Sequence, residues 1–179
     1  MQHPDQGRFA TSVLPHLDAA YNLARWLVRD DHDAQDVVQD ALVRALRHFD
    51  GFRGGDPRPW LLAIVRNSAW AWLGARRPGD VDVHDDELDA ALVDGAPPSD
   101  PETLAIRRAE RLQIDAAIAA LPIAFREAVV LRELEEMSYR DIARITGVPI
   151  GTVMSRLSRG RHLLAAALRP AASDSRTMA

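Results

Sequence analysis

An acidic segment divides this sequence into two parts and limits what it can fold into. Residues 78–102 contain nine Asp and Glu residues and no Arg, and they include the helix-breaking run "GAPPSDP". Like charges repel one another and proline interrupts helices, so the segment favours a linker over a packed core. On both sides of it, apolar residues recur at helical spacing, without sustained alternation typical of strands. The sequence therefore predicts an all-α protein with two small helical domains joined by a flexible acidic linker.

The helical pattern gives boundaries for these parts. In the first part we expect three or four helices, among them one over 8–29, one over 33–49 and one over about 60–75. On the first helix, one face carries Phe9, Val13, Leu17, Tyr21, Ala24 and Val28. The predicted domains are 8–77 and 102–169, with a linker at 78–101 and a disordered tail at 170–179.

The composition excludes several classes of function. The 179 residues include no Cys, and all 22 basic residues are Arg. Thiol chemistry, Schiff-base chemistry and the P-loop lysine are therefore absent. The N-terminus lacks the features of a signal peptide and no apolar run is long enough to span a bilayer, so we expect a cytoplasmic protein.

In the second part, we expect one helix to end near Leu121 and the next to run from Pro122 to about Glu136. The following residues match a helix-turn-helix, in which two short helices approach closely. Ser138 is a natural N-cap for a helix over 139–146, and Gly147 can take the left-handed conformation that ends it. Small Ala143, the turn glycine and apolar Val153 have the spacing that this packing requires.

The stretch "GVPIGTVMSRLSRGRHLL" (147–164) allows two interpretations. Its glycines could cradle a phosphate, or its arginines could enter a DNA groove. The missing lysine argues against a nucleotide site, and the polar face of the second helix suits a major groove. Residues 138–169 contain six Arg and one acidic residue, although the whole chain has a net charge of −4. The expected duplex contacts are Arg140, Arg144, Thr152, Ser155, Arg156, Arg159 and Arg161, with His162 beside them; the alternative is a solvated Arg-rich helix.

Two blocks of the sequence resemble an RNA polymerase sigma factor of the extracytoplasmic-function (ECF) group, in the sigma-70 family. The block "DAQDVVQDALVRALRHFDGFRGGDPRPWLLAIVRNSAW" resembles region two of that family. The block "LPIAFREAVVLRELEEMSYRDIARITGVPIGTVMSRLSRGRHLL" resembles region four. The resemblance implies a transcription initiation factor that binds core RNA polymerase and directs it to promoter DNA. Region two would then open the minus-ten element, and region four would read the minus-thirty-five element.

The resemblance also implies where the polymerase and the melted strand bind. Asp36, Gln39 and Asp40 match positions that dock on the basic polymerase clamp, where carboxylates and an amide are suitable partners. A melted minus-ten strand needs cations and groups that capture bases. The matching candidates are Arg53, Arg58, Trp60, Arg66, Asn67 and Trp70. Trp60 also fits a core position, and neither Trp70 nor Trp72 has a counterpart that fixes its role.

The family further implies control by an anti-sigma protein, often one linked to the membrane. We expect no cofactor, no metal site and no small-molecule substrate. The six histidines show no metal-ligand spacing, and "HDDELD" (84–89) lies in the predicted linker. The rival interpretations are a one-component helix-turn-helix DNA-binding regulator and an enzyme. A regulator of this kind would not explain the polar face with Asp36, Gln39 and Asp40, or the arginines and tryptophans between residues 53 and 70. An enzyme would need a plausible catalytic group, and the sequence offers none.

Overall fold

The computed structural model describes residues 4–76 and 100–169. Within these ranges the chain forms helices, turns and bends, with no strand. The linker predicted at 78–101 falls almost entirely outside the described residues, and so do "HDDELD" and the tail at 170–179. No helix within the two described ranges is long and apolar enough to cross a membrane.

Residues 4–76 form a first lobe with four α-helices. They are α1 (Pro4–Val13), α2 (Leu17–Val28), α3 (Asp31–His48) and α4 (Pro57–Ala75), with short 3-10 turns at Leu14–His16 and Phe49–Gly51. Helices α2, α3 and α4 pack on one another around an apolar core. That core includes Leu23, Leu27, Val37, Ala41, Leu61, Leu62 and Val65, all less than 4% exposed.

The single helix expected over 8–29 is wrong. The chain forms α1 and α2 with a 3-10 turn between them, and Pro15 lies in that turn. Proline has no backbone N–H and its ring clashes with the carbonyl four residues earlier, so it ends the first helix. The apolar spacing continues through the break, which is why periodicity alone missed it. Val13 and Ala24 are still buried.

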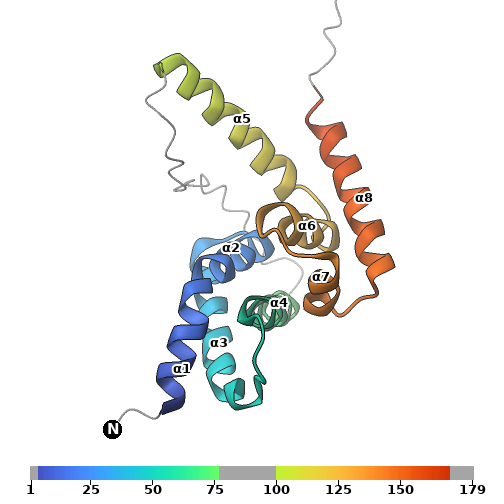
Figure 1. The fold of residues 1–179 in the computed structure, drawn as a ribbon. Coiled ribbons are helices and arrows are strands. Elements are labelled where there is room, and N and C mark those ends of the chain that lie inside the picture. Colours follow the sequence, from blue (N-terminus) through green and yellow to red (C-terminus); the bar gives the residue numbers. More distant parts are fainter. Residues whose placement is uncertain (1–3, 77–99, 170–179) are drawn as a thin grey trace, which may run out of the picture.

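Residues 100–169 form a second lobe. It contains α5 (Pro101–Ala119), α6 (Ile123–Val129), a π-helical turn η3 (Val130–Leu134), α7 (Tyr139–Thr146) and α8 (Ile150–Ala167). The helix expected from Pro122 to Glu136 is shorter than predicted, because α6 widens into the π turn and Glu136 has a left-handed backbone (φ 52°). Helix α5 extends away from the rest of the molecule (Figure 1).

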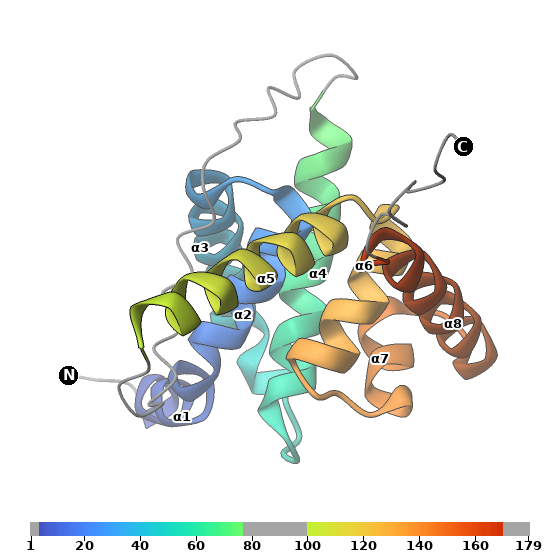
Figure 2. The same ribbon diagram turned by 90° about the horizontal axis from the view of Figure 1, so that it is seen from above.

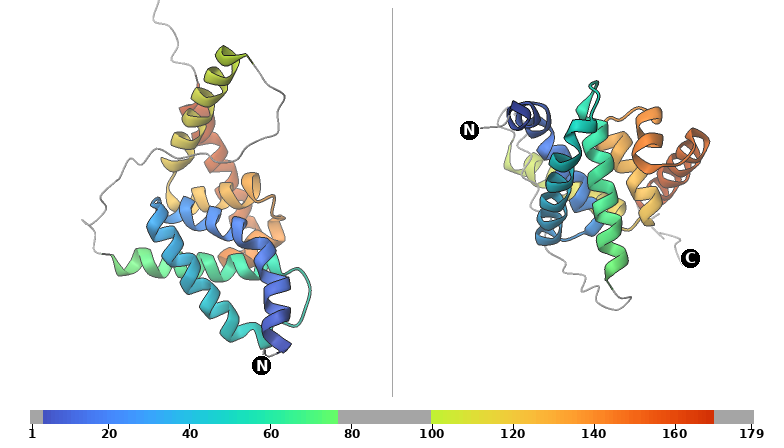
Figure 3. Two further views of the ribbon diagram at one scale, coloured as in Figure 1. Left: turned by 90° about the vertical axis from the view of Figure 1, so that its left-hand side faces the viewer. Right: turned by 90° about the horizontal axis from the view of Figure 1, so that it is seen from below.

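The two lobes pack against each other. Helix α4 contacts α7, and α2 contacts α6. Figures 1 and 2 show α4 between α3 and α7, with α8 on the outer side of the second lobe. The contact between α4 and the second lobe is also visible from below (Figure 3). Residues separated by 60 or more positions in the sequence, such as Arg66 and Glu127, therefore meet between the lobes.

Candidate nucleic-acid interface

The helix-turn-helix has the capping expected from its sequence. The Ser138 hydroxyl accepts a hydrogen bond from the Asp141 backbone N–H at 3.1 Å, which caps the first turn of α7. Gly147 ends that helix with φ 70°, and its N–H donates to the Ala143 carbonyl. Because glycine adopts this left-handed conformation without steric cost, α8 can leave α7 at a sharp angle. Both predictions are confirmed.

One face of α8 is buried and the opposite face is polar. Val153 and Leu157 are each 1% exposed and pack into the lobe. Ser155 and Arg159 are exposed, and Thr152 is half-buried at the start of the helix. Arg140 and Arg144 are exposed on α7 beside them. Hydroxyls and guanidinium groups spaced in this way can contact bases and phosphates in a major groove.

Three arginines of this surface already have acidic neighbours, and one of them is Arg144, whose guanidinium lies 3.6 Å from Asp141 on the same helix. Arg161 donates to the Glu133 carboxylate at 2.6 Å and 2.9 Å, and this hydrogen bonding raises the pKa of the Arg161 guanidinium. Arg156 lies 3.9 Å from the buried Glu127 carboxylate, and its side chain is only 25% exposed. Arg156 is therefore less available than Arg159 in this arrangement.

The loop before α4 presents two left-handed glycines. Gly54 and Gly55 have φ values of 90° and 96°, which other residues rarely adopt. Asp56 follows them and caps α4 by accepting from the Arg58 N–H. Arg53 is exposed in the same loop. The loop therefore places a cation and accessible backbone at one end of the first lobe.

Trp60 lies in an aromatic cluster next to this loop. Its ring is 5.1 Å from that of Phe52 and 6.1 Å from that of Phe49, measured between centroids. The side chain is partly buried and packs on the core of the first lobe. This packing agrees with a mainly structural role for Trp60.

Three of the predicted strand contacts on α4 face the second lobe. Arg66 forms an ion pair with Glu127 at 2.6 Å, and the indole N–H of Trp70 donates to the same carboxylate at 2.9 Å. The Arg66 guanidinium also lies 4.9 Å from the centre of the Trp70 ring. Arg58 forms an ion pair with Glu135 at 2.6 Å. By contrast, Asn67 is exposed on the same helix.

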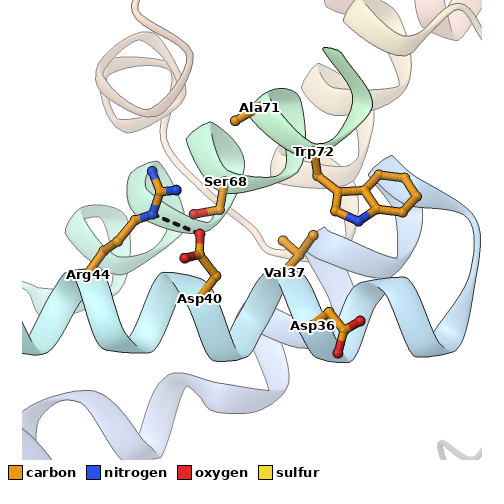
Figure 4. Close-up of a pocket in the computed structure, with 7 residues that line it drawn as sticks. All are labelled: Asp36, Val37, Asp40, Arg44, Ser68, Ala71 and Trp72. Atoms are coloured by element: carbon orange, nitrogen blue, oxygen red, sulfur yellow. Dashed lines mark ion pairs between the residues drawn. The ribbon is translucent and has the colours of Figure 1, made fainter. Parts of the chain in front are cut away.

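The polar face of α3 is accessible, as predicted. Asp36, Gln39 and Asp40 are all exposed. Asp36 and Asp40 line a shallow pocket between α3 and α4, opposite Trp72 (Figure 4). Figure 4 also shows the ion pair of Asp40 with Arg44, whose N–O distance is 2.7 Å.

Trp72 borders the pocket between α3 and α4, and its ring packs against the guanidinium of an arginine. The Arg76 guanidinium lies 3.8 Å from the centre of the Trp72 ring and also pairs with Asp33 at 3.0 Å. Burial raises the pKa of Asp33, and its neighbour Asp30 adds to that effect. Trp72 therefore links the end of α4 to the start of α3.

The sequence interpretation missed the residues that join the lobes. Arg126, Glu127 and Glu135 come from the second lobe and are all buried. Arg126 donates to the Trp26 carbonyl near the end of α2 at 3.1 Å and to the Leu121 carbonyl at 3.2 Å. Burial lowers its pKa to about 10, and it remains protonated at neutral pH. The signal was present in the sequence, since "RE" interrupts an otherwise apolar run from Ile123 to Leu131.

Comparison with known proteins identifies the family. The sigma-70 region 2 family matches residues 13–77, and the sigma-70 region 4 family matches residues 111–164. The ECF RNA polymerase sigma-E factor of Escherichia coli is 38% identical over 175 residues, covering 95% of this chain and 91% of the relative. The chain belongs to the ECF sigma factors. Sigma factors bind core RNA polymerase and direct transcription initiation at promoters, so the function expected from the sequence is confirmed.

Two further relatives extend this result. The RNA polymerase sigma-H factor of Pseudomonas aeruginosa is 36% identical over 178 residues, covering 95% of this chain and 91% of the relative. The sigma factor RpoE of Bartonella quintana, solved in complex with the anti-sigma factor NepR, has a TM-score of 0.67 and 30% identity. That likeness covers 90% of this chain and 96% of the other, so the similarity includes both lobes of this sigma factor.

Proposed function

We propose that this sigma factor reads a promoter with two separate surfaces, one on each lobe. Region two would comprise residues 8–77 and region four residues 102–169, with the linker at 78–101 between them and a tail at 170–179. The observation that carries the proposal is the capped helix-turn-helix with its exposed polar α8 face, in a chain that also matches region two.

Region four reads the minus-thirty-five element as duplex in this proposal. Helix α8 enters the major groove, where Thr152, Ser155, Arg156 and Arg159 reach base edges or phosphates. Arg140, Arg144 and Arg161 flank it and contact the phosphate backbone. The exposed positions of Arg140, Arg144, Ser155 and Arg159 support this role.

Region two binds the melted minus-ten strand. Arg53, Arg58 and Arg66 supply positive charge along a single strand, and Asn67 and Trp70 contact unstacked bases. The glycine pair before α4 supports close approach of the backbone. Trp60 contributes mainly by packing on Phe49 and Phe52, which holds the loop in place.

The exposed face of α3 docks on the polymerase clamp. Asp36, Gln39 and Asp40 provide acceptors for basic side chains on the partner. The adjoining pocket contains the buried Ser68 hydroxyl, which has no hydrogen-bond partner among the described residues. A clamp side chain that enters this pocket would give that hydroxyl a partner.

An anti-sigma protein holds this factor inactive until a signal arrives. The support is the similar sigma factor of Bartonella quintana, whose structure contains an anti-sigma factor. We expect this partner to receive the signal. Anti-sigma proteins are often linked to the membrane, and we expect the same of this one. The factor itself acts in the cytoplasm beside the polymerase. It has no enzymatic activity of its own, because the polymerase performs the chemistry.

The proposal is tested by transcription in vitro with core RNA polymerase over a promoter library. We expect core-dependent transcripts from templates that share two short motifs separated by a fixed spacer. A one-component regulator would instead bind its duplex without the core enzyme. Duplex binding that does not depend on the core, with no transcripts from any template, would contradict the assignment.

A further inference from the structure

The contact between the lobes uses buried charged groups. Glu127 is fully buried on α6, where Arg66 and Trp70 of α4 both donate to it. Glu135 is 4% exposed and accepts from Arg58 and Asn22 of the first lobe. Two second-lobe carboxylates are therefore neutralised by first-lobe donors.

Such a contact behaves differently from an apolar one. A buried carboxylate is tolerated when cations and hydrogen-bond donors replace the water it has lost. Separating the lobes costs little free energy from these ion pairs, because water then hydrates the carboxylates and the arginines. A polar interface of this kind suits lobes that dock and part, whereas large apolar interfaces hold domains together permanently.

The groups held in this contact are those assigned to the melted strand. A carboxylate and a phosphate both accept charge-assisted hydrogen bonds from arginine. Glu127 therefore takes the place at Arg66 that a strand phosphate would take, and Glu135 does the same at Arg58. Glu127 also binds the indole N–H of Trp70, which holds that ring in the contact between the lobes. Arg53 and Asn67 lie outside the contact and are exposed.

We infer that Glu127 and Glu135 form an internal lock that closes the free sigma factor over its own strand-binding residues. The inference rests on the proposed function in one respect, the assignment of Arg58, Arg66 and Trp70 to the minus-ten strand. Use of these residues requires the lobes to separate.

The lock also reaches the duplex-reading helix. Arg156 of α8 lies 3.9 Å from the second oxygen of Glu127, while Arg66 binds the first oxygen at 2.6 Å. One carboxylate therefore contacts an arginine from each proposed promoter surface. Separation of the lobes releases Arg66 and leaves Arg156 as the cation near Glu127, so opening changes both surfaces together.

A pair of dyes measures whether the lock holds the lobes together. The chain has no natural Cys, so Arg47→Cys on α3 and Ala166→Cys on α8 give labels at two exposed positions. In the free wild-type chain we expect one short interdye distance by single-molecule energy transfer. Glu127→Gln with Glu135→Gln should move most molecules to longer distances, because Arg66 and Arg58 lose their charged partners.

The matched control is Glu133→Gln, since Glu133 is exposed and pairs with Arg161 inside the second lobe. It should keep the short distance. Arg66→Ala weakens the same contact from the first lobe and leaves α6 unchanged, so it should also open the molecule. An unchanged short distance in both the double variant and Arg66→Ala, with helical content preserved, would overturn the lock.

Binding of a fluorescent, mixed-sequence single-stranded oligonucleotide provides the second readout. The closed form should dominate in the wild type. The double variant should then bind about ten-fold more tightly, since a larger fraction of its molecules is open and able to bind the strand. Glu110→Gln, which removes an exposed acid from α5, should bind as the wild type does. Opened lobes without tighter binding would show that the contact does not block the strand-binding residues, which also overturns the lock.

The two proposals fail in different ways. If the wild type starts transcription with core polymerase and the double variant stays closed, the lock is wrong and the function stands. If the double variant opens and binds the oligonucleotide but no variant supports transcription, the proposed function is wrong.

Discussion

Gly160 determines how closely α8 packs on α6. A Cβ atom at this position would lie 2.8 Å from Cγ2 of Val129 and 3.5 Å from the Phe125 carbonyl oxygen. A side chain at this position would therefore have to displace Val129 or push α8 away from α6. Gly160 was not selected from the sequence, because a helical glycine looks the same whether or not a second helix lies against it.

Gly160→Ala should therefore destabilise the second lobe by about 1–3 kcal/mol, the usual cost of overpacking. Chemical denaturation followed by circular dichroism measures the change in the free energy of unfolding. Gly151→Ala is the matched control on the same helix, since a Cβ there meets nothing within 4 Å. It should be neutral or stabilising by up to about 1 kcal/mol, because alanine favours helix. Equal effects of the two variants would contradict the packing argument.

At the scale of single elements, α8 carries the proposed duplex contacts. Arg156→Ala should weaken recognition of the minus-thirty-five element by about 1–3 kcal/mol if its contact is bidentate. Footprints of the holoenzyme on a promoter and on variants with a changed upstream motif measure this loss. Arg111→Ala removes the same charge from exposed α5 and should leave the footprint unchanged. Identical promoter choice by Arg156→Ala and the wild type would remove Arg156 from the reading surface.

Helix α3 carries the proposed clamp contacts. Gln39→Ala combined with Asp40→Ala should reduce the affinity for core polymerase and leave promoter preference unchanged, because neither side chain is among the proposed DNA contacts. Titration of labelled factor with core enzyme measures the affinity. Asp18→Ala removes an exposed acid from α2 and serves as the control. Undiminished assembly of the double variant would exclude the α3 face from the clamp contact.

The elements also show how far the sequence could be interpreted. Helix α7 was predicted with its observed bounds because Ser138 and Gly147 mark its ends through local chemistry. The break at Pro15 was missed because the apolar spacing continues across it. The π turn after α6 was not predicted, since no local signal distinguishes it from a regular helix. Exposure of the α3 and α8 faces followed from periodicity.

At the scale of the whole molecule, the arrangement of the lobes lay beyond the sequence. Arg66 and Glu127 are 61 residues apart, and their ion pair depends on how two separately predictable lobes dock. Arg58, Arg66 and Trp70 were selected from the sequence as contacts to the melted strand, and that role stays a prediction. Their partners in the described structure are carboxylates of the second lobe, which periodicity could not reveal.

Each lobe carries one of the two proposed promoter-binding surfaces, and the lobes must separate when the factor binds core polymerase. The most direct measurement is the interdye distance between Arg47→Cys and Ala166→Cys before and after saturating core RNA polymerase is added. We expect the short distance of the free factor to be replaced by a long one in the complex. A complex that forms and starts transcription while keeping the short distance would contradict the account.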